Sequence, residues 1–191
     1  MRKNFGPKNF IYPMPVLIVG TYDENGKADA MTAAWGCSAD YTKVCLILDK
    51  SHKTVANILA HKAFTVSMAN AANVVEADFV GIVSANNDPD KLAKTKWTLS
   101  KSEFVDAPII AELPLTLECT LDKWDEEREM VIGDIVNASI DEAILDEKGS
   151  VDVKKLDPIA FDCVAHTYLR MGECIAKAFN VGLELKNSAE N

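Results

Sequence analysis

Short apolar runs separated by turn residues dominate the first third of the chain. The patterns of residues 16–22 and 63–68 predict strands, and residues 43–49 form an apolar run without helical spacing that predicts a buried strand. An Asn-Gly pair within residues 23–26 is typical of a hairpin turn, so residues 28–36 are expected to form the return strand.

Helical spacing of apolar residues is confined to short segments. It predicts a helix over residues 53–61, with Ser51 or Thr54 as its N-cap, and a second helix over residues 73–83. A third short helix is expected over residues 88–96, because Asp88 is suited to the N-cap and Pro89 to the first turn.

The second half of the chain returns to strands. Residues 115–122 alternate between apolar and polar side chains, which predicts an antiparallel strand with one buried face. Residues 129–140 are expected to pair with it, with Gly133 at a bulge. Many strands with few helices are typical of a barrel, so we predict an α+β, mainly β fold in a single domain over residues 1–191.

Composition narrows the class of protein. Hydrophobic residues make up 48% of the 191 residues, enough for a substantial core, yet no stretch approaches the length of a membrane span. A net charge of −9 argues against nucleic acid as a partner. The chain starts without an apolar signal segment, and these features together predict a cytoplasmic protein that acts neither on nucleic acid nor at a membrane.

Cysteine and histidine spacing gives no sign of a metal site. None of the five cysteines forms a Cys-x-x-Cys pair, and Cys45, Cys119 and Cys163 lie in apolar runs that predict small core residues. The three histidines are scattered. Neither a Gly-x-Gly-x-x-Gly motif nor a P-loop is present, so any redox role has to come from another kind of bound cofactor.

The start of the helix expected at residues 53–61 has the composition of an anion site. The first turn of a helix presents unpaired N–H groups and partial positive charge, which favour a phosphate. Lys53 adds a full charge, and the hydroxyls of Ser51 and Thr54 add donors, with His52 between them. The same residues are also compatible with an ordinary capped surface helix.

The return strand at residues 28–36 carries an unusual number of alanines and glycines. Small side chains in a strand allow a ligand or another backbone to approach closely, although close packing against a helix is an equal explanation. Trp35 near its end is either a wall for a planar ligand or a core anchor.

Segments spread along nearly the whole chain match one family as a set. They are Phe5–Pro7, Tyr12–Val16, Gly20–Lys27, Asp29–Gly36, Ser51–Thr54, Asp78–Gly81, Asp90–Leu92, Phe104–Pro108, Leu117–Cys119, Pro158–Asp162, Tyr168 and Gly172-Glu173. In this set the chain resembles the flavoredoxin-type flavin reductases, whose fold is an FMN-binding split barrel.

The resemblance implies a homodimer with non-covalent FMN at the subunit interface and electron transfer from NAD(P)H or a redox protein. It also implies the cofactor-binding residues, which are Asp29, Met31, Thr32, Ala33, Ala34, Trp35, Ser51, His52, Lys53, Thr54, Lys91, Arg128 and Tyr168. Hydride transfer to a flavin needs no side-chain acid or base, so no catalytic residue is assigned.

Four of these positions have a competing structural explanation. Lys91 is either a flavin contact or a solvated lysine, and Tyr168 either packs near the flavin ring or belongs to the core. Arg128 stands where relatives often carry a histidine, and its alternative role is to neutralise the neighbouring glutamates. Asp29 replaces a common asparagine, so it either points away from the flavin or lowers its reduction potential.

Two other functions share parts of this pattern. A pyridoxamine-phosphate-oxidase-like flavoenzyme uses the same kind of barrel, and a non-catalytic module could bind flavin or haem without turnover. Fold-level similarity does not separate these from a reductase.

Overall fold

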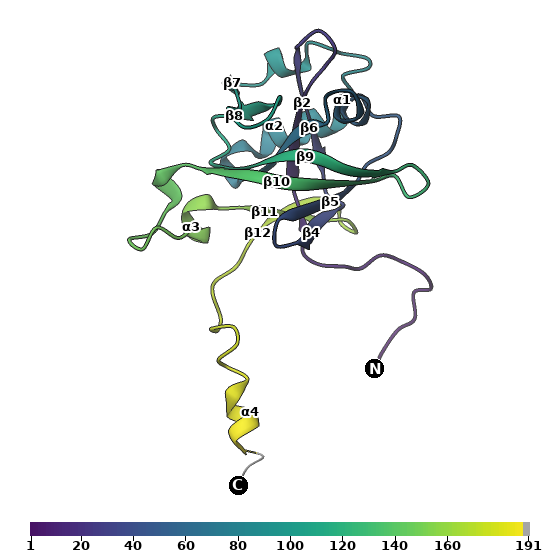
Figure 1. The fold of residues 1–191 in the computed structure, drawn as a ribbon. Coiled ribbons are helices and arrows are strands. Elements are labelled where there is room, and N and C mark those ends of the chain that lie inside the picture. The colour runs from purple at the N-terminus through teal and green to yellow at the C-terminus, as the bar shows by residue number, and fades with distance from the viewer. Residues whose placement is uncertain (189–191) are drawn as a thin grey trace.

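The computed structural model describes residues 1–188, and one curled antiparallel sheet forms most of its body (Figure 1). Seven strands pair in the order β3-β2-β6-β9-β10-β5-β4, and every neighbouring pair is antiparallel. Their bounds are β2 Leu17–Tyr22, β3 Ala28–Ala33, β4 Gly36–Asp40, β5 Lys43–Ile47, β6 Ala63–Met68, β9 Leu115–Asp125 and β10 Met130–Ile140.

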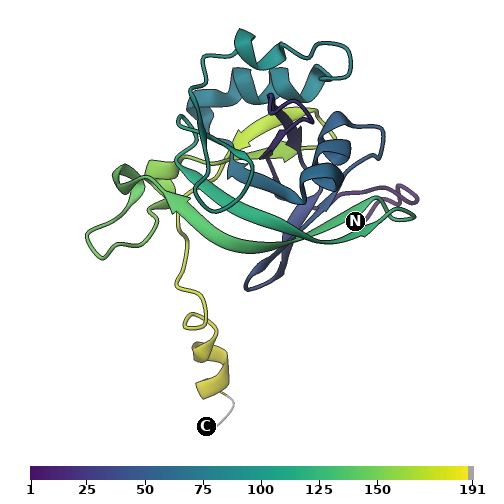
Figure 2. The same ribbon diagram turned by 45° about the horizontal axis from the view of Figure 1, so that its top comes forward.

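The two edges of this sheet are consecutive in the sequence. β3 ends at Ala33 and β4 begins at Gly36, so only Ala34 and Trp35 connect the opposite edges. Three steps along the chain span at most about 11 Å, which forces the sheet to curl until its edges approach one another. Figure 2 shows the long β9–β10 hairpin curving across the body. The predicted barrel is therefore confirmed, and it is open along the seam between β3 and β4.

Smaller elements surround the curled sheet. β1 (Met14–Pro15) pairs with β11 (Ile159–Asp162), which pairs with β12 (Thr167–Arg170), and β7 (Leu99–Lys101) pairs with β8 (Pro108–Ile110). The α-helices are α1 Lys53–His61, α2 Val74–Ile82, α3 Val153–Leu156 and α4 Leu183–Ser188, and the 3₁₀ turns are η1 Ala71–Asn73, η2 Lys91–Lys94 and η3 Glu142–Ile144. After β12 the chain extends away from the body to α4 in both views (Figures 1 and 2).

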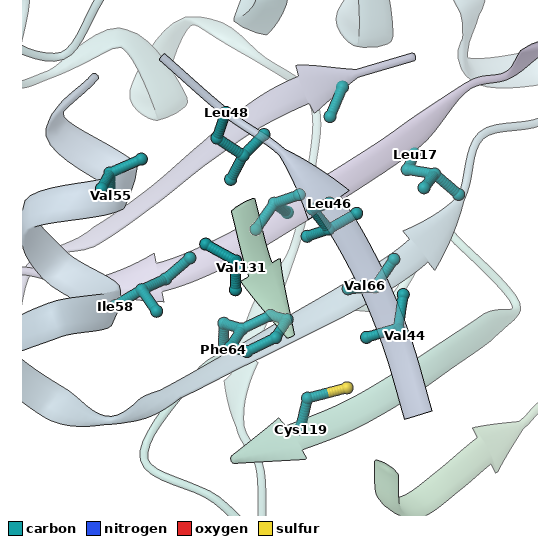
Figure 3. Packing of buried hydrophobic residues seen from close by; sticks show 12 residues of the cluster. Leu17, Val44, Leu46, Leu48, Val55, Ile58, Phe64, Val66, Cys119 and Val131 are labelled. Atoms are coloured by element: carbon teal, nitrogen blue, oxygen red, sulfur yellow. The ribbon is translucent and has the colours of Figure 1, made fainter. Parts of the chain in front are cut away.

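Side chains from the sheet and from α1 fill the interior of the barrel. Phe64 of β6 is fully buried there, and Val55 and Ile58 bring the apolar face of α1 against it (Figure 3). A second cluster lies on the outer face of β2 and β3, where Ile18 packs with Val80 of α2. Strand β2 is buried on both faces from Leu17 to Thr21, which agrees with the apolar run that begins it.

Several sequence-based predictions are confirmed. The strands at residues 17–22 and 63–68 and the helices at residues 53–61 and 74–82 form within a residue or two of the expected bounds. The turn at residues 23–26 joins β2 to β3, and Gly26 has the positive φ of +76° that such a turn requires.

Three predictions about local structure are wrong. His52 occupies the N-cap of α1 without a side-chain hydrogen bond, because the Ser51 hydroxyl donates to Asp49 and the Thr54 hydroxyl donates to Asp29. The helix expected over residues 88–96 is only the 3₁₀ turn η2. The strand expected over residues 43–49 forms as β5 over Lys43–Ile47, but its burial alternates and Cys45 is only half-buried.

Burial along β9 also differs from the expected pattern. Its polar face was expected to meet solvent, yet Glu118 is fully buried and accepts hydrogen bonds from Ser102 and Asn137. The loop after β7 therefore covers the second face of this strand. Cys119 is buried as expected, whereas Cys163 lies half-buried at the start of a turn and is not a core residue.

No helix in the described part of the chain combines the length and apolar character needed to cross a membrane.

The predicted bulge at Gly133 is confirmed and couples β10 to the core. The register between β9 and β10 shifts between Ile132 and Gly133. A Cβ atom at Gly133 would overlap the ring of Phe64, whose position is fixed by the buried cluster around it.

We therefore expect Gly133→Ala to lower the free energy of unfolding by about 1–3 kcal/mol, the usual cost of overpacking a core. Denaturant unfolding of both variants and the parent chain measures this. Gly172→Ala is the matched control, because a Cβ atom at Gly172 meets nothing within 4 Å and should leave stability within about 0.5 kcal/mol. Equal unfolding midpoints for the two variants would contradict this account of the bulge.

Candidate functional site

A cavity of about 380 Å³ opens at the seam where the two sheet edges meet. We call it the apolar cavity, and its lining comes from β3, the seam, β5, α2 and the β11–β12 hairpin. The lining residues are Val16, Met31, Thr32, Ala33, Ala34, Trp35, Ile47, Leu48, His52, Asp78, Gly81, Ile82, Phe161 and Tyr168. Its volume and mainly apolar walls are typical of a small-molecule site.

A smaller cavity of about 150 Å³ continues from it toward the start of α1. We call it the polar end, and it is lined by Asp29, Met31, Thr32, His52, Lys53, Thr54, Val80, Gly81, Ile82, Val83, Ser84, Ala85 and Lys91. Five of these residues, namely Met31, Thr32, His52, Gly81 and Ile82, line both cavities. The two cavities therefore form one groove with an apolar and a polar half.

The N-terminus of α1 supplies hydrogen-bond donors to the polar end. The backbone N–H groups of Lys53 and Thr54 have no acceptor among the described residues, as is usual in the first turn of a helix. The Nδ1 atom of His52 is also buried without a partner in the described part of the chain. Together with the helix dipole, the two backbone N–H groups favour an anion at this position.

Asp29 and Lys91 form an almost fully buried ion pair in the floor of the polar end. Lys91 Nζ lies 3.3 Å from Asp29 Oδ1 and donates to the carbonyls of Val80 and Val83 at 3.1 and 2.8 Å. The Thr54 hydroxyl donates to the other oxygen of Asp29 at 3.1 Å. Burial lowers the pKa of Lys91, and the neighbouring Asp29 opposes that shift.

This geometry excludes one alternative for Lys91 and locates Asp29, whereas their contacts with a flavin stay predictions. Asp29 faces Lys91 and Thr54 and does not line the apolar cavity, so it points away from the half of the groove suited to a ring. Lys91 is buried, so it is not a solvated helix lysine.

Lys53 reaches the same end of the groove from the first turn of α1. Its ammonium contacts Glu24 in the β2–β3 turn, with Nζ 2.7 Å from Oε2. The Cα atom of Lys53 is held in place by the first turn of α1, and the ammonium at the end of its side chain forms an ion pair with an exposed carboxylate.

Trp35 lies at the seam and is half-exposed. Its side chain retains 51% of its accessible surface, so the interpretation of Trp35 as a core anchor is wrong. The backbone carbonyl of Trp35 accepts from the N–H of Ile47, which ties the seam to β5 and orients the indole along the groove wall.

Tyr168 and Asp78 bring a polar pair into the apolar cavity. The Tyr168 hydroxyl donates to Asp78 Oδ1 at 2.8 Å, and the Tyr168 ring packs against Phe161. Burial, reinforced by the bond to Asp78, raises the pKa of Tyr168 to about 12. Tyr168 therefore remains a neutral donor, and the carboxylate nearest the apolar half is Asp78.

Two predicted site residues have side chains outside the groove. The Ser51 hydroxyl donates to Asp49 at 2.6 Å, and Ser51 lines neither cavity. Arg128 lies in the β9–β10 turn, where its guanidinium pairs with Asp125 at 2.9 Å. A role for either residue in binding stays a prediction.

Sequence reasoning did not assign several of the groove residues, among them Asp78, Gly81 and Phe161. Asp78 and Gly81 lie in one segment of α2 and Phe161 in β11, and both segments belong to the set that carried the resemblance. Gly81 had a further signal, because a glycine inside a helical pattern often marks a close approach. A Cβ atom at Gly81 would lie 3.1 Å from Thr32, so α2 packs directly on β3.

In the described residues, histidine, cysteine and acidic side chains do not gather in groups of three that could hold a metal ion.

The family model for the flavin reductase like domain matches residues 10–161, which contain the whole groove except Tyr168. The chain belongs to this family. A protein of Aquifex aeolicus (strain VF5) without an assigned function is 29% identical over 126 residues, a match that spans 65% of this chain and 64% of that protein.

Solved structures of flavoredoxins share nearly the whole fold. The flavoredoxin of Desulfovibrio vulgaris (Miyazaki F) is 36% identical with a TM-score of 0.91, and the match covers 95% of this chain and 100% of that one. The flavoredoxin of Methanosarcina acetivorans is 26% identical with a TM-score of 0.88, with 97% and 99% covered. The FMN-binding domain of a flavin reductases-like enzyme from Shewanella baltica OS155 is 22% identical with a TM-score of 0.77, with 85% and 88% covered, and shows the shared fold.

The exposure of Trp35 predicts how it differs from a core tryptophan. We expect Trp35→Phe to leave the free energy of unfolding within about 0.5 kcal/mol but to reduce the quenching of tryptophan emission by added FMN and to shift the flavin absorbance bands. Trp97→Phe is the control, because Trp97 is buried and donates to Asn73 at 3.0 Å. It should lose about 1–3 kcal/mol with unchanged flavin bands.

The unfolding midpoint and the flavin absorbance are measured on the same samples. Together they decide whether Trp35 borders the flavin or anchors the core. A destabilised Trp35→Phe protein with unshifted bands would remove Trp35 from the site.

Proposed function

We propose that the protein binds FMN non-covalently in the groove and acts as an FMN-dependent oxidoreductase of the flavin reductase type. Its electron donor is NAD(P)H or a redox protein. The observation that carries the proposal is the continuity of the groove, which joins an apolar wall to the N-terminus of a helix. A phosphorylated planar cofactor needs both features in one site.

The polar end fits a phosphate. The unpaired N–H groups of Lys53 and Thr54 would hold it together with the Lys53 ammonium. The buried, unpartnered Nδ1 of His52 is a further polar atom that a ligand in the groove would satisfy.

The apolar half fits a ring. Ala33 and Ala34 leave space beside the seam, and Trp35 and Ile82 supply apolar walls on either side of it. Bound FMN would supply the electron-accepting ring that the chain itself lacks. The contribution of the chain is to orient that ring, to exclude water from its buried face and to set nearby charge through Asp78 and Tyr168.

We also propose that a second copy of the chain covers the open side of the groove. Trp35, Ile47 and Ile82 line the apolar cavity and yet expose 51%, 42% and 75% of their side chains, which is a large apolar rim for a monomer. The segment after β12 carries further exposed apolar side chains, such as Phe179, away from the body. A homodimer would bury both surfaces.

Cofactor release and turnover test the proposed activity. Purified protein reconstituted with FMN should be yellow, should release its flavin into the supernatant on acid precipitation, and should oxidise NADH or NADPH with a suitable acceptor. Flavin retained in the acid pellet would refute non-covalent binding. Yellow protein that oxidises neither NADH, NADPH nor a reduced redox protein would instead support the non-catalytic flavin module.

Lys53 should distinguish FMN from riboflavin. A charge-assisted contact to phosphate is worth about 1.5–3 kcal/mol, so Lys53→Ala should weaken FMN binding roughly ten- to a hundredfold. Riboflavin affinity should scarcely change, because riboflavin lacks the phosphate. Titration of both ligands by flavin fluorescence measures the two constants, and an equal loss for both would show that Lys53 supports the fold rather than the phosphate.

A further inference from the structure

The β2–β3 turn forms two ion pairs with segments beside the polar end of the groove. Glu24 in this turn contacts Lys53 of α1 at 2.7 Å, and Lys27 on the other side of the turn contacts Asp90 at 2.5 Å. Asp90 directly precedes Lys91, the buried lysine in the floor of the polar end. The turn therefore bridges the two segments that carry the lysines of the site.

The backbone of this turn is held in place by its own hydrogen bonds. Asp23 Oδ1 accepts from the N–H groups of Asn25 and Lys27 at 2.8 and 2.9 Å, and the Asp23 carbonyl accepts from Gly26 at 2.9 Å. The Asp23 carbonyl also lies 2.9 Å from Nε2 of His61, at the end of α1. Glu24 is thus presented to α1 from a fixed position, with only its side chain free to move.

The charges at the polar end balance. Lys91 is paired with Asp29, and Lys53 is paired with Glu24, so two cations face two carboxylates. The first pair is buried and fixed, whereas the Glu24 side chain is 67% exposed and can turn into water at little cost. A phosphate arriving at α1 consequently meets Lys53 already engaged by a carboxylate.

We propose, on the basis of the FMN site described above, that Glu24 competes with the FMN phosphate for Lys53 and so sets how strongly the groove prefers FMN to riboflavin. The Lys53 ammonium exchanges Glu24 for the phosphate when FMN binds, and returns to Glu24 when FMN leaves. Glu24 is a specificity-determining residue that weakens phosphate recognition and keeps the cofactor exchangeable.

The charge-neutral variant Glu24→Gln removes the competitor and keeps the shape of the side chain. Exposed ion pairs are worth little, so FMN affinity should rise by about two- to fivefold while riboflavin affinity stays unchanged. The measurement is the ratio of the FMN and riboflavin dissociation constants, obtained by fluorescence titration at one fixed salt concentration. The FMN dissociation rate should fall by a similar factor.

The chain offers a matched control in a second turn of the same kind. In the turn Asp146-Glu147-Lys148-Gly149, Asp146 Oδ1 accepts from the N–H groups of Lys148 and Ser150, and Gly149 has the same φ of +76° as Gly26. Glu147→Gln makes the same change in net charge, but Glu147 forms no ion pair with a lysine of the groove in the described part of the chain. The ratio of the FMN and riboflavin dissociation constants in the Glu147→Gln protein should equal that of the parent chain.

A second comparison separates competition for Lys53 from simple repulsion of the phosphate. In a Lys53→Met background, Glu24→Gln should no longer change the affinity ratio if Glu24 acts through Lys53. An equal gain with and without Lys53, or the same gain for Glu147→Gln, would overturn the proposal. So would an unchanged ratio in Glu24→Gln protein that still binds both flavins.

The outcome also distinguishes this proposal from the function on which it rests. Parent protein that binds neither FMN nor riboflavin would overturn the proposed cofactor and the role of Glu24 together. Parent protein that binds both flavins, with a ratio insensitive to Glu24, would overturn the role of Glu24 alone.

Discussion

The short connection between β3 and β4 is the constraint on which the rest of the structure depends. These strands form opposite edges of one sheet, and Ala34 and Trp35 alone connect them, so the sheet has to curl until its edges nearly meet. The strand ladder is interrupted at this seam, which leaves side chains free to line a groove. The small residues beside Trp35 keep that groove open, and α2 and the β11–β12 hairpin build its other walls.

The two halves of the groove offer different interactions to an occupant. Apolar side chains at the seam bury surface against whatever occupies the groove, and their contribution grows with the area covered. The polar end depends instead on groups fixed by the fold, namely the first turn of α1 and the buried pair of Asp29 and Lys91. Lys91 also donates to two backbone carbonyls and Asp29 accepts from Thr54, so both charges are engaged within the protein. Lys53 is the more adaptable charge because its partner, Glu24, is largely exposed.

Sequence patterns predicted the elements that depend on local order. The Asn-Gly turn, the helical spacing of α1 and α2 and the bulge at Gly133 all follow from neighbouring residues, and each is confirmed. Two further failures involve contacts between distant segments. Glu118 is buried because the loop carrying Ser102 folds over β9, and Asp78 joins the groove because Tyr168, 90 residues later, bonds to it. No local pattern contains such information.

The difference between local patterns and distant contacts also explains which site residues were predicted from the sequence. The small-residue segment and the start of α1 were identified from composition and helix physics, but the single strand expected over residues 28–36 is divided into β3 and β4 at the seam. The groove does bring Trp35, Lys53 and Lys91 to one surface. The Ser51 hydroxyl donates to Asp49 instead of capping α1, and sequence alone does not rank these two local hydrogen bonds. The apolar wall is half-exposed and the charges of the polar end are balanced, so each half alone would bind a ligand weakly. Binding has to offset the translational and rotational entropy that the ligand loses. In the proposed function, the continuity of the groove would therefore give specificity, because only a ligand with both a ring and an anion would use its two halves at once.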